Sequence, residues 1–593
     1  MIRTPLRPLA RILDARAQGV NPLTIEKENL RLRREQARDA GRRRAEWRLL
    51  LLATAFFAGY AAIGAKMGML AASPVVETEP YVGETISGER ADVLDCNGHI
   101  LATNLVTHSL YAELRYMVDG RHAAHELARI FPDLDEERLA ARLTDPNRRF
   151  DWIRARVSPE QAQAAHDIGE PGLLLGPRDM RLYPNGTLAA HVLGGTTYGE
   201  QGVTAAEIQG VAGMEYAENQ RLSDADLADV PLTTTLDLGV QAVVEEVLAD
   251  GIAMYNANGG SAILMDAHTG EIVAMASAPT FDPNDRPAPL VDPNADPADS
   301  PLFNRAVQGL YELGSVMKVF AVAQALELGL VTPDTPIDTR GPITYGRFRI
   351  NDFHHMPASM SVTDVLVESS NVGTARIAQM IGAERQQQFL GSLGLLDRMP
   401  IELAESSRVR PLVPDHWSEL SAMTISYGHG LSMTPLHLAA GYAAILNGGT
   451  LVQPTLLRRP DAAPGPRVVS ERTSRIMRSM LRSVVTEGTA SFGEVEGYAV
   501  GGKTGTADKP RPQGGYYEDR TVATFAGAFP INDPRYVFVV TMDEPQIFAA
   551  GENRRTAGWT VVPVVAQMIA RVAPMLGMRP QDPAEIEEAL RLR

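Results

Sequence analysis

The hydrophobic pattern begins with a long apolar stretch near the N-terminus of the 593-residue chain. Residues 49–65, LLLLATAFFAGYAAIGA, carry no charge, and the uncharged pattern resumes after Lys66. A helix rises about 1.5 Å per residue, so roughly 20 such residues span a bilayer. We therefore predict a transmembrane helix at 49–72, in which Lys66 extends to the membrane interface. A buried core helix is the alternative that fits this length less well.

Residues 73–230 follow with short elements of mixed type. RADVLDCNGHILATNL alternates apolar residues on both sides of Asn97-Gly98, a pairing that favours a β-hairpin. Helical periodicity appears in HAAHELARIF and in EERLAARL. No group of side chains here indicates catalysis, so we predict a mixed pedestal domain that supports or docks the rest.

The pattern changes again from residue 231 onward. We expect a helix at 237–255, a hairpin that turns at 268–270, and mainly helices from 315 to 450. Strand patterns return in EGYAVGGKTGTA, RTVATFAGAFP and RYVFVVTMD, and a helix follows in VVPVVAQMIARVAP. Strands at both ends of a helical middle predict one α+β domain over 231–577. The polar tail, 578–593, is predicted to form a loose terminal helix.

Charge is distributed unevenly along this pattern. Residues 1–48 contain 13 Lys+Arg and 6 Asp+Glu, whereas the whole chain has a net charge of −16. The arginines of GRRRAEWR lie directly before the apolar stretch, and positive residues stay on the cytoplasmic side of a membrane. We therefore predict a basic cytoplasmic head, 1–48, with everything after the span outside the cytoplasm. A cleaved signal peptide fits less well because this leader is long. The acidic balance disfavours nucleic acid as a partner.

The cysteine and histidine residues indicate whether the chain forms disulfides or binds metal. Cys96 is the single cysteine, which excludes an intramolecular disulfide and any site ligated by several cysteines. His354 and His355 are adjacent and would point apart on a helix or a strand. We therefore predict no metal centre.

Lysine is rare in this chain, and its positions are informative. Only five of the 56 basic residues are lysines, yet Lys318 stands three residues after Ser315 in GLYELGSVMKVF. On a helix the two side chains would share a face. A serine hydroxyl needs a base to become a nucleophile, and lysine can be that base if burial or a nearby positive charge lowers its pKa. Arginine cannot, because it stays protonated.

Two further motifs carry groups suited to the same chemistry. Ser369-Ser370-Asn371 precedes a helical run, so these residues are either ordinary N-cap residues or a proton relay with a substrate-binding amide. Lys503-Thr504-Gly505-Thr506 lies on an expected strand, where the lysine either protects a sheet edge or binds a carboxylate beside the hydroxyls. In the second interpretation, Gly505 lets substrate lie close to the strand.

The order Ser-x-x-Lys, Ser-x-Asn, Lys-Thr-Gly, at intervals of 54 and 134 residues, is the signature of serine acyltransferases that act on D-Ala-D-Ala termini and β-lactams. With these motifs the chain resembles the class B penicillin-binding proteins, the monofunctional peptidoglycan transpeptidases, along nearly its whole length. FNRAVQGLYELGSVMK, AHTGEIVAMAS and ISYGHGLSMTPLHLAAGYAAILNGG support the resemblance, as do YPNGTLAAHVLG and GVAGMEYAENQRL in the pedestal. Cys96 stands where the family usually has arginine and Ala91 where it has glycine, which puts only pedestal contacts in doubt.

The resemblance implies a fold and a set of roles. The fold is a penicillin-binding, serine β-lactamase-like α+β transpeptidase domain with a pedestal and one transmembrane helix. Ser315 would be the nucleophile, Lys318 its base, Ser369 a proton relay and Asn371 a donor-positioning amide. The strand residues that would hold the substrate carboxylate are Lys503, Thr504, Gly505 and Thr506. No metal or diffusible cofactor would be required.

The resemblance also implies a setting. The chain would be a single-pass protein of the bacterial inner membrane with a periplasmic catalytic domain, cross-linking stem peptides and binding β-lactams. The moderate length and basic head favour the division-specific, septal branch, whose partners are a membrane-embedded glycan polymerase and other division proteins. Three alternatives stay open: an elongation-type transpeptidase, a hydrolase such as a D,D-carboxypeptidase or β-lactamase, and a catalytically silent scaffold or sensor.

Overall fold

The computed structural model describes residues 8–72, 90–201, 206–292, 294–459, 463–511, 514–549 and 551–591. The chain divides into two compact units, Met1–Thr85 and Ile86–Arg593. Each unit has its own internal organisation.

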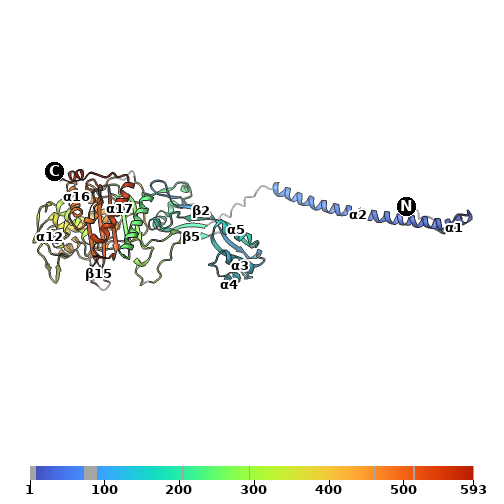
Figure 1. Ribbon diagram of the computed structural model, residues 1–593, viewed down its shortest axis with the longest axis horizontal. Coiled ribbons are helices and arrows are strands. Elements are labelled where there is room, and N and C mark those ends of the chain that lie inside the picture. Colours follow the sequence, from blue (N-terminus) through green and yellow to red (C-terminus); the bar gives the residue numbers. More distant parts are fainter. Residues whose placement is uncertain are drawn as a thin grey trace. The chain divides into compact units, whose positions relative to one another are not determined.

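The first unit consists of α1 (Pro8–Ala17) and the long α2 (Pro22–Ala72), drawn in blue in Figure 1. Within α2, residues Glu46–Lys66 are long and apolar enough to cross a membrane, and no part of their apolar window is buried in the protein. A helix covers residues 49–72 as predicted but begins earlier, and its passage across a membrane stays a prediction. Arg, Glu, Ala and Leu dominate the preceding segment and favour helix, and Arg31 pairs with Glu35 one turn away.

A five-stranded antiparallel sheet forms the centre of the second unit, in the order β14-β15-β16-β8-β9. Helices α9 and α17 pack on one face, and α15 and α16 on the other. Both faces are therefore covered, which explains why β8 and β16 are buried along their whole length. The bounds are β8 (Gly259–Asp266), β9 (Ile272–Ala278), β14 (Gly501–Pro510), β15 (Tyr516–Phe529), β16 (Tyr536–Asp543), α9 (Leu238–Met254), α15 (Pro435–Leu446), α16 (Glu471–Thr486) and α17 (Ala557–Met575).

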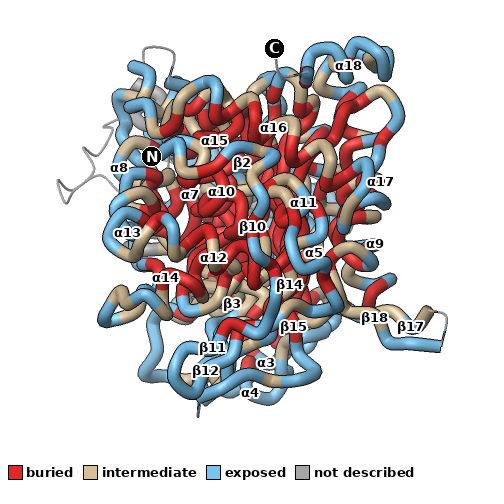
Figure 2. The backbone as a smooth tube through the Cα atoms, turned by 90° about the vertical axis from the view of Figure 1, so that its left-hand side faces the viewer, coloured by how far each residue is buried: buried red, intermediate tan, exposed pale blue. Residues whose placement is uncertain are grey.

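The chain leaves this sheet after β9 and returns at β14, so the helical middle is an insertion between strands that belong to one sheet. Its centre is α10 (Lys318–Glu327), which packs against α12 (Asn371–Ile381) and α16. The tube around α10 and α12 is largely buried in Figure 2, whereas the hairpin of β11 (Ile343–Tyr345) and β12 (Phe348–Ile350) is exposed at the rim. The α+β architecture predicted from the sequence is confirmed.

The pedestal is built on β2 (Ile100–Glu113), which pairs with β3 (Phe150–Val157) and β4 (Leu173–Leu182). The expected hairpin at Asn97-Gly98 joins β1 (Val93–Leu94) to β2. Helices α3 (Gly120–Ile130), α4 (Glu136–Leu143) and α5 (Pro159–Asp167) close a small separate core against this sheet. The half-buried Cys96 donates its backbone N–H to Leu236 O, at the start of the larger domain.

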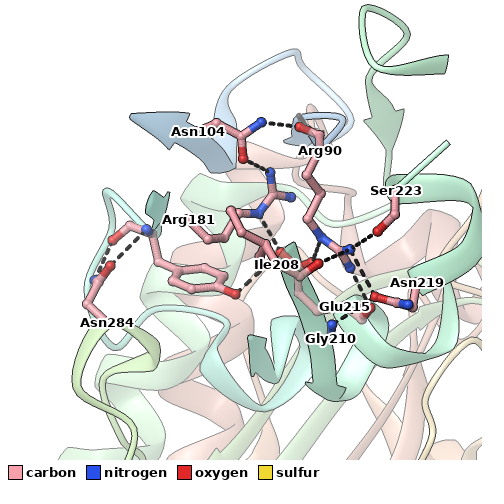
Figure 3. A network of polar contacts seen from close by, with 10 residues as sticks. Arg90, Asn104, Arg181, Ile208, Gly210, Glu215, Asn219, Ser223 and Asn284 are labelled. Carbon is pink, nitrogen blue, oxygen red and sulfur yellow. Dashed lines mark hydrogen bonds and ion pairs between the residues drawn. The ribbon is translucent and has the colours of Figure 1, made fainter. Parts of the chain in front are cut away.

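A buried ion-pair network holds the base of the pedestal together (Figure 3). The carboxylate of Glu215 accepts hydrogen bonds from Arg90 Nε at 2.6 Å and from Arg181 Nε at 2.7 Å. Arg90 also donates to Asn219 and to Ser223, which satisfies more of its guanidinium. Burial lowers the pKa of Arg90 and the charge of Glu215 opposes that shift.

The C-terminal tail differs from its prediction. Residues Pro583–Leu590 form α18, with Asp582 accepting the backbone N–H of Ala584 at its N-terminus. Ile586 and Leu590 are buried. The helix is therefore packed rather than loose, because its two apolar side chains lie one turn apart on one face.

Candidate active site

The turn at residues 312–315, named here the nucleophile turn after the role expected of Ser315, lies directly against the edge strand β14, because two glycines allow the backbones to approach. A Cβ on Gly505 would lie 2.2 Å from Leu313 O, and one on Gly314 would lie 2.7 Å from Thr506 O. Gly314 also has φ of +64°, a conformation that glycine adopts without strain. Contact with the chain's own turn therefore requires glycine at 505, and the expectation that Gly505 also lets substrate lie close to the strand stays a prediction.

Ser315 and Lys318 lie at the junction of two helix types. Ser315 is half-buried within a 3₁₀ turn, Gly314–Met317, and Lys318 is the first residue of α10. The expected continuous α-helix is thus replaced by a tighter turn, in which side chains three residues apart are eclipsed. Lys318 is fully buried, and its Nζ donates to Ser369 O at 2.5 Å and to Ser369 Oγ at 3.1 Å.

The environment of Lys318 favours the neutral form of its amine. Burial lowers the pKa of Lys318 well below its usual value, and the positive charge of Lys503 lowers it further, while Asp352 acts in the opposite direction. These are the two causes anticipated from the sequence. A lysine in this position is deprotonated far more readily than one in water.

Within the Ser369-Ser370-Asn371 segment, the N-cap alternative is confirmed for Ser370, and the relay and substrate-binding roles of Ser369 and Asn371 stay predictions. Ser370 is the N-cap of α12, and its Oγ accepts the backbone N–H of Gly373 at 2.9 Å. Ser369 has φ of +62°, an unusual conformation for a residue with a side chain, and its hydroxyl faces Lys318. Asn371 is half-buried, with its Nδ2 donating to Asn351 O at 3.2 Å.

Lys503 is completely buried, so the alternative that it protects an exposed sheet edge is wrong. Its Nζ donates to Thr504 O at 3.2 Å, and burial lowers its pKa to about 7. The hydroxyl of Thr504 lies 2.8 Å from that of Thr489. Thr506 Oγ1 accepts the backbone N–H of Ala557, which fixes β14 to the start of α17.

Asp352 is a residue of this site that the sequence motifs did not reveal. Its carboxylate accepts hydrogen bonds from Ser370 Oγ and from the backbone N–H groups of Asn371 and Val372, at the N-terminus of α12. It therefore fixes the segment that carries Ser369. No local pattern in NDFHHMP signals this role, because its partners lie about twenty residues away in the chain.

Protein-family models match the two parts of the second unit. The penicillin-binding protein transpeptidase domain matches residues 260–566, and the penicillin-binding protein dimerisation domain matches residues 85–226. The first match covers more than half of the chain and spans every motif described above. The chain belongs to the class B penicillin-binding proteins.

Particular relatives extend this assignment over nearly the full length. The probable peptidoglycan D,D-transpeptidase FtsI of Caulobacter vibrioides is 32% identical over 559 residues, covering 92% of this chain and 91% of that protein. The Escherichia coli K12 peptidoglycan D,D-transpeptidase FtsI is 29% identical over 487 residues, covering 78% and 80%. Penicillin binding protein 3 of Mycobacterium tuberculosis complexed with aztreonam has a TM-score of 0.61 at 27% identity, covering 84% of this chain and 98% of that one.

Proposed function

We propose that this chain is a peptidoglycan D,D-transpeptidase that works through an acyl-enzyme on Ser315. Lys318 removes the Ser315 proton as Oγ bonds to the carbonyl carbon of the penultimate D-Ala of a donor stem peptide. The C–N bond to the terminal D-Ala then breaks, and Ser369 passes the proton to the departing amine. A neutral amine of a second stem peptide attacks the ester carbonyl carbon, the C–O bond to Ser315 breaks, and the proton lost by the amine returns to Ser315 Oγ through Lys318, which completes the cross-link.

The remaining motif residues hold the donor in this proposal. Lys503, Thr504 and Thr506 bind the terminal carboxylate, and Asn371 binds the peptide backbone. Backbone N–H groups of Ser315 and Thr506 stabilise the oxyanion. Gly505 contributes by allowing the contact between β14 and the turn that carries Ser315.

The observation that carries this function is the buried contact between Lys318 and Ser369. Lys318 has no exposed surface, its pKa is strongly lowered, and the Ser369 hydroxyl lies 3.1 Å from its Nζ. This arrangement suits proton transfer. A structural lysine would instead be paired with a carboxylate. The arrangement argues against a catalytically silent scaffold.

The setting of the reaction is part of the same proposal. One apolar N-terminal helix supports a single-pass membrane anchor. The basic residues before it support a cytoplasmic N-terminus and a periplasmic catalytic domain in the bacterial inner membrane. Similarity to proteins named FtsI supports a septal role with a membrane-embedded glycan polymerase and other division proteins as partners.

β-Lactams would acylate Ser315 in place of the stem peptide. The similar penicillin binding protein 3 of Mycobacterium tuberculosis, solved in complex with aztreonam, supports this expectation.

Intact-mass analysis of the full-length chain in detergent, incubated with a penicillin, tests this function. We expect a long-lived adduct of one drug mass that is absent from Ser315→Ala. Rapid destruction of the drug without a lasting adduct would show a hydrolase instead. Folded protein with neither adduct nor turnover would contradict the proposed chemistry.

A further inference from the structure

Four side chains beside Ser315 have no part in the chemistry above. Glu312 belongs to the nucleophile turn, Tyr427 and His429 to the turn at 427–430, and Tyr516 begins β15. The two turns touch through backbone, since a Cβ on Gly428 would lie 2.0 Å from Gly314 O. The cluster of Glu312, Tyr427, His429 and Tyr516 is therefore fixed at one side of the nucleophile.

Direct contacts connect the members of this cluster. Glu312 Oε1 accepts the backbone N–H of Gly430 at 2.9 Å and the hydroxyl of Tyr516 at 3.2 Å. The His429 ring contacts the Tyr427 ring and the Tyr516 ring, with centroids 5.4 Å and 5.5 Å away. Tyr516 is 40% exposed, so the core does not enclose its side chain.

Beneath Tyr516, two polar atoms lie enclosed without a partner. Glu312 Oε2 and His429 Nδ1 have no hydrogen-bond partner within the parts of the chain that the structure describes. Buried polar atoms are nearly always paired with protein groups, ordered water or ligands, so two such atoms in one cluster mark a place where a polar ligand can bind. Both atoms belong to titratable groups within reach of the nucleophile turn.

The chemical groups of the cluster are suited to bind a cationic ligand. A carboxylate and an imidazole lone pair accept hydrogen bonds from an ammonium group, and the faces of aromatic rings attract it as well. Burial and the charge of Lys318 lower the pKa of His429, which favours the neutral ring that keeps a lone pair. Of the reactants, the acceptor supplies such a cation, because a free amine is protonated near neutral pH.

We propose that Glu312 and His429, with the rings of Tyr427 and Tyr516, bind the ammonium group of the acceptor stem peptide, and that the Tyr516 hydroxyl holds this place until the acceptor arrives. The proposal rests on the acyl-enzyme at Ser315 and adds the site of its second substrate. Glu312 and His429 bind and orient the ammonium group, which transfers one proton to the unpaired Nδ1 of His429 before the free amine attacks the ester carbonyl carbon.

The test separates acylation of Ser315 from release of the acyl group. The full-length chain in detergent is acylated with a D-alanyl thioester, and release is followed by mass with either D-alanine or hydroxylamine at mildly alkaline pH. D-Alanine carries an ammonium group, whereas hydroxylamine is an uncharged amine under these conditions. Glu312→Gln keeps the shape and acceptor oxygen but removes the charge. Glu518→Gln, an exposed position two residues beyond Tyr516, is the matched control.

We expect Glu312→Gln to leave acylation within about twofold, to slow release by D-alanine about tenfold or more, and to leave release by hydroxylamine unchanged. Tyr516→Phe should lower the D-alanine concentration that gives half-maximal release, because the competing hydroxyl is gone. Equal slowing with both amines, no slowing with either, or loss of acylation in Glu312→Gln would each overturn the proposal. Failure of the unmodified chain to acylate would instead refute the function on which it rests.

Discussion

At the scale of single residues, the site depends on what burial does to lysine. Lys318 and Lys503 are both completely enclosed, and each has a pKa below its usual value because the charged form loses its hydration. The rarity of lysine in an arginine-rich chain pointed to both positions. Burial itself, and the contact of Lys318 with Ser369, could not be inferred from the sequence.

Lys318→Arg should abolish acylation of Ser315, with the rate falling by at least about a hundredfold. Arginine keeps the positive charge but does not release its proton near neutral pH, so Ser315 would have no base. The rate of penicillin adduct formation measures the effect, and circular dichroism confirms the fold. Acylation at the normal rate would contradict the role given to Lys318.

Lys503→Met should move the pH dependence of acylation. In the proposed mechanism acylation requires neutral Lys318, so the rate should rise with pH through the pKa of Lys318. The charge of Lys503 lowers that pKa, and its removal raises it, so the acidic limb of the profile should shift to higher pH. Lys509→Met is the control, because Lys509 is paired with Asp543 and Glu544. If the acidic limb of the pH profile is unchanged in Lys503→Met, the charge of Lys503 does not influence the pKa of Lys318.

At the scale of elements, the site is a junction between a 3₁₀ turn, an edge strand and a helix N-terminus. The apolar and polar periodicities predicted β14, β15, β16 and α9 because each buries a regular face or a continuous run. They did not predict the 3₁₀ turn at Ser315. Its tight geometry follows from packing against β14, not from local propensity.

Gly505→Ala should slow acylation by roughly a hundredfold while the protein stays folded, because a small displacement of a nucleophile has effects of that size. The added Cβ cannot remain 2.2 Å from Leu313 O, so the nucleophile turn must move. Gly391→Ala provides the matched control, since its nearest neighbour would lie 3.9 Å from the new Cβ. Penicillin adduct formation measures both variants, and equal rates would show that the turn tolerates displacement.

At the scale of the whole molecule, distant parts of the chain meet in the second unit. The larger hydrophobic core includes residues of the pedestal as well as of the transpeptidase domain, for example Ala91 and Val540. The domain boundaries at 230 and 577 remain predictions, and the pedestal is bound to its neighbour by more than a linker. The backbone N–H of Gly213 donates to the carboxylate of Glu405 across this boundary, whereas the buried network around Glu215 joins distant segments within the pedestal itself.

Glu215→Gln should lower the free energy of unfolding of the second unit by about 3–5 kcal/mol, because two buried guanidinium groups lose their counter-charge. Denaturant unfolding of the full-length chain measures the change, with the exposed Glu137→Gln in the same pedestal as the control. A loss below about 1 kcal/mol would mean that solvent or other groups satisfy Arg90 and Arg181.

The sequence by itself determined the family, the order of the elements and the motif residues Ser315, Lys318, Ser369, Asn371 and Lys503–Thr506. Spacing and residue type are local properties, and they are visible without a fold. The tertiary structure alone decided the low pKa of Lys318, the hydrogen bonds by which Asp352 fixes the Ser369 segment, and the cluster that contains Glu312 and His429. These depend on groups far apart in the chain, whose distances and hydration are set only when the sheet and its inserted helices pack together.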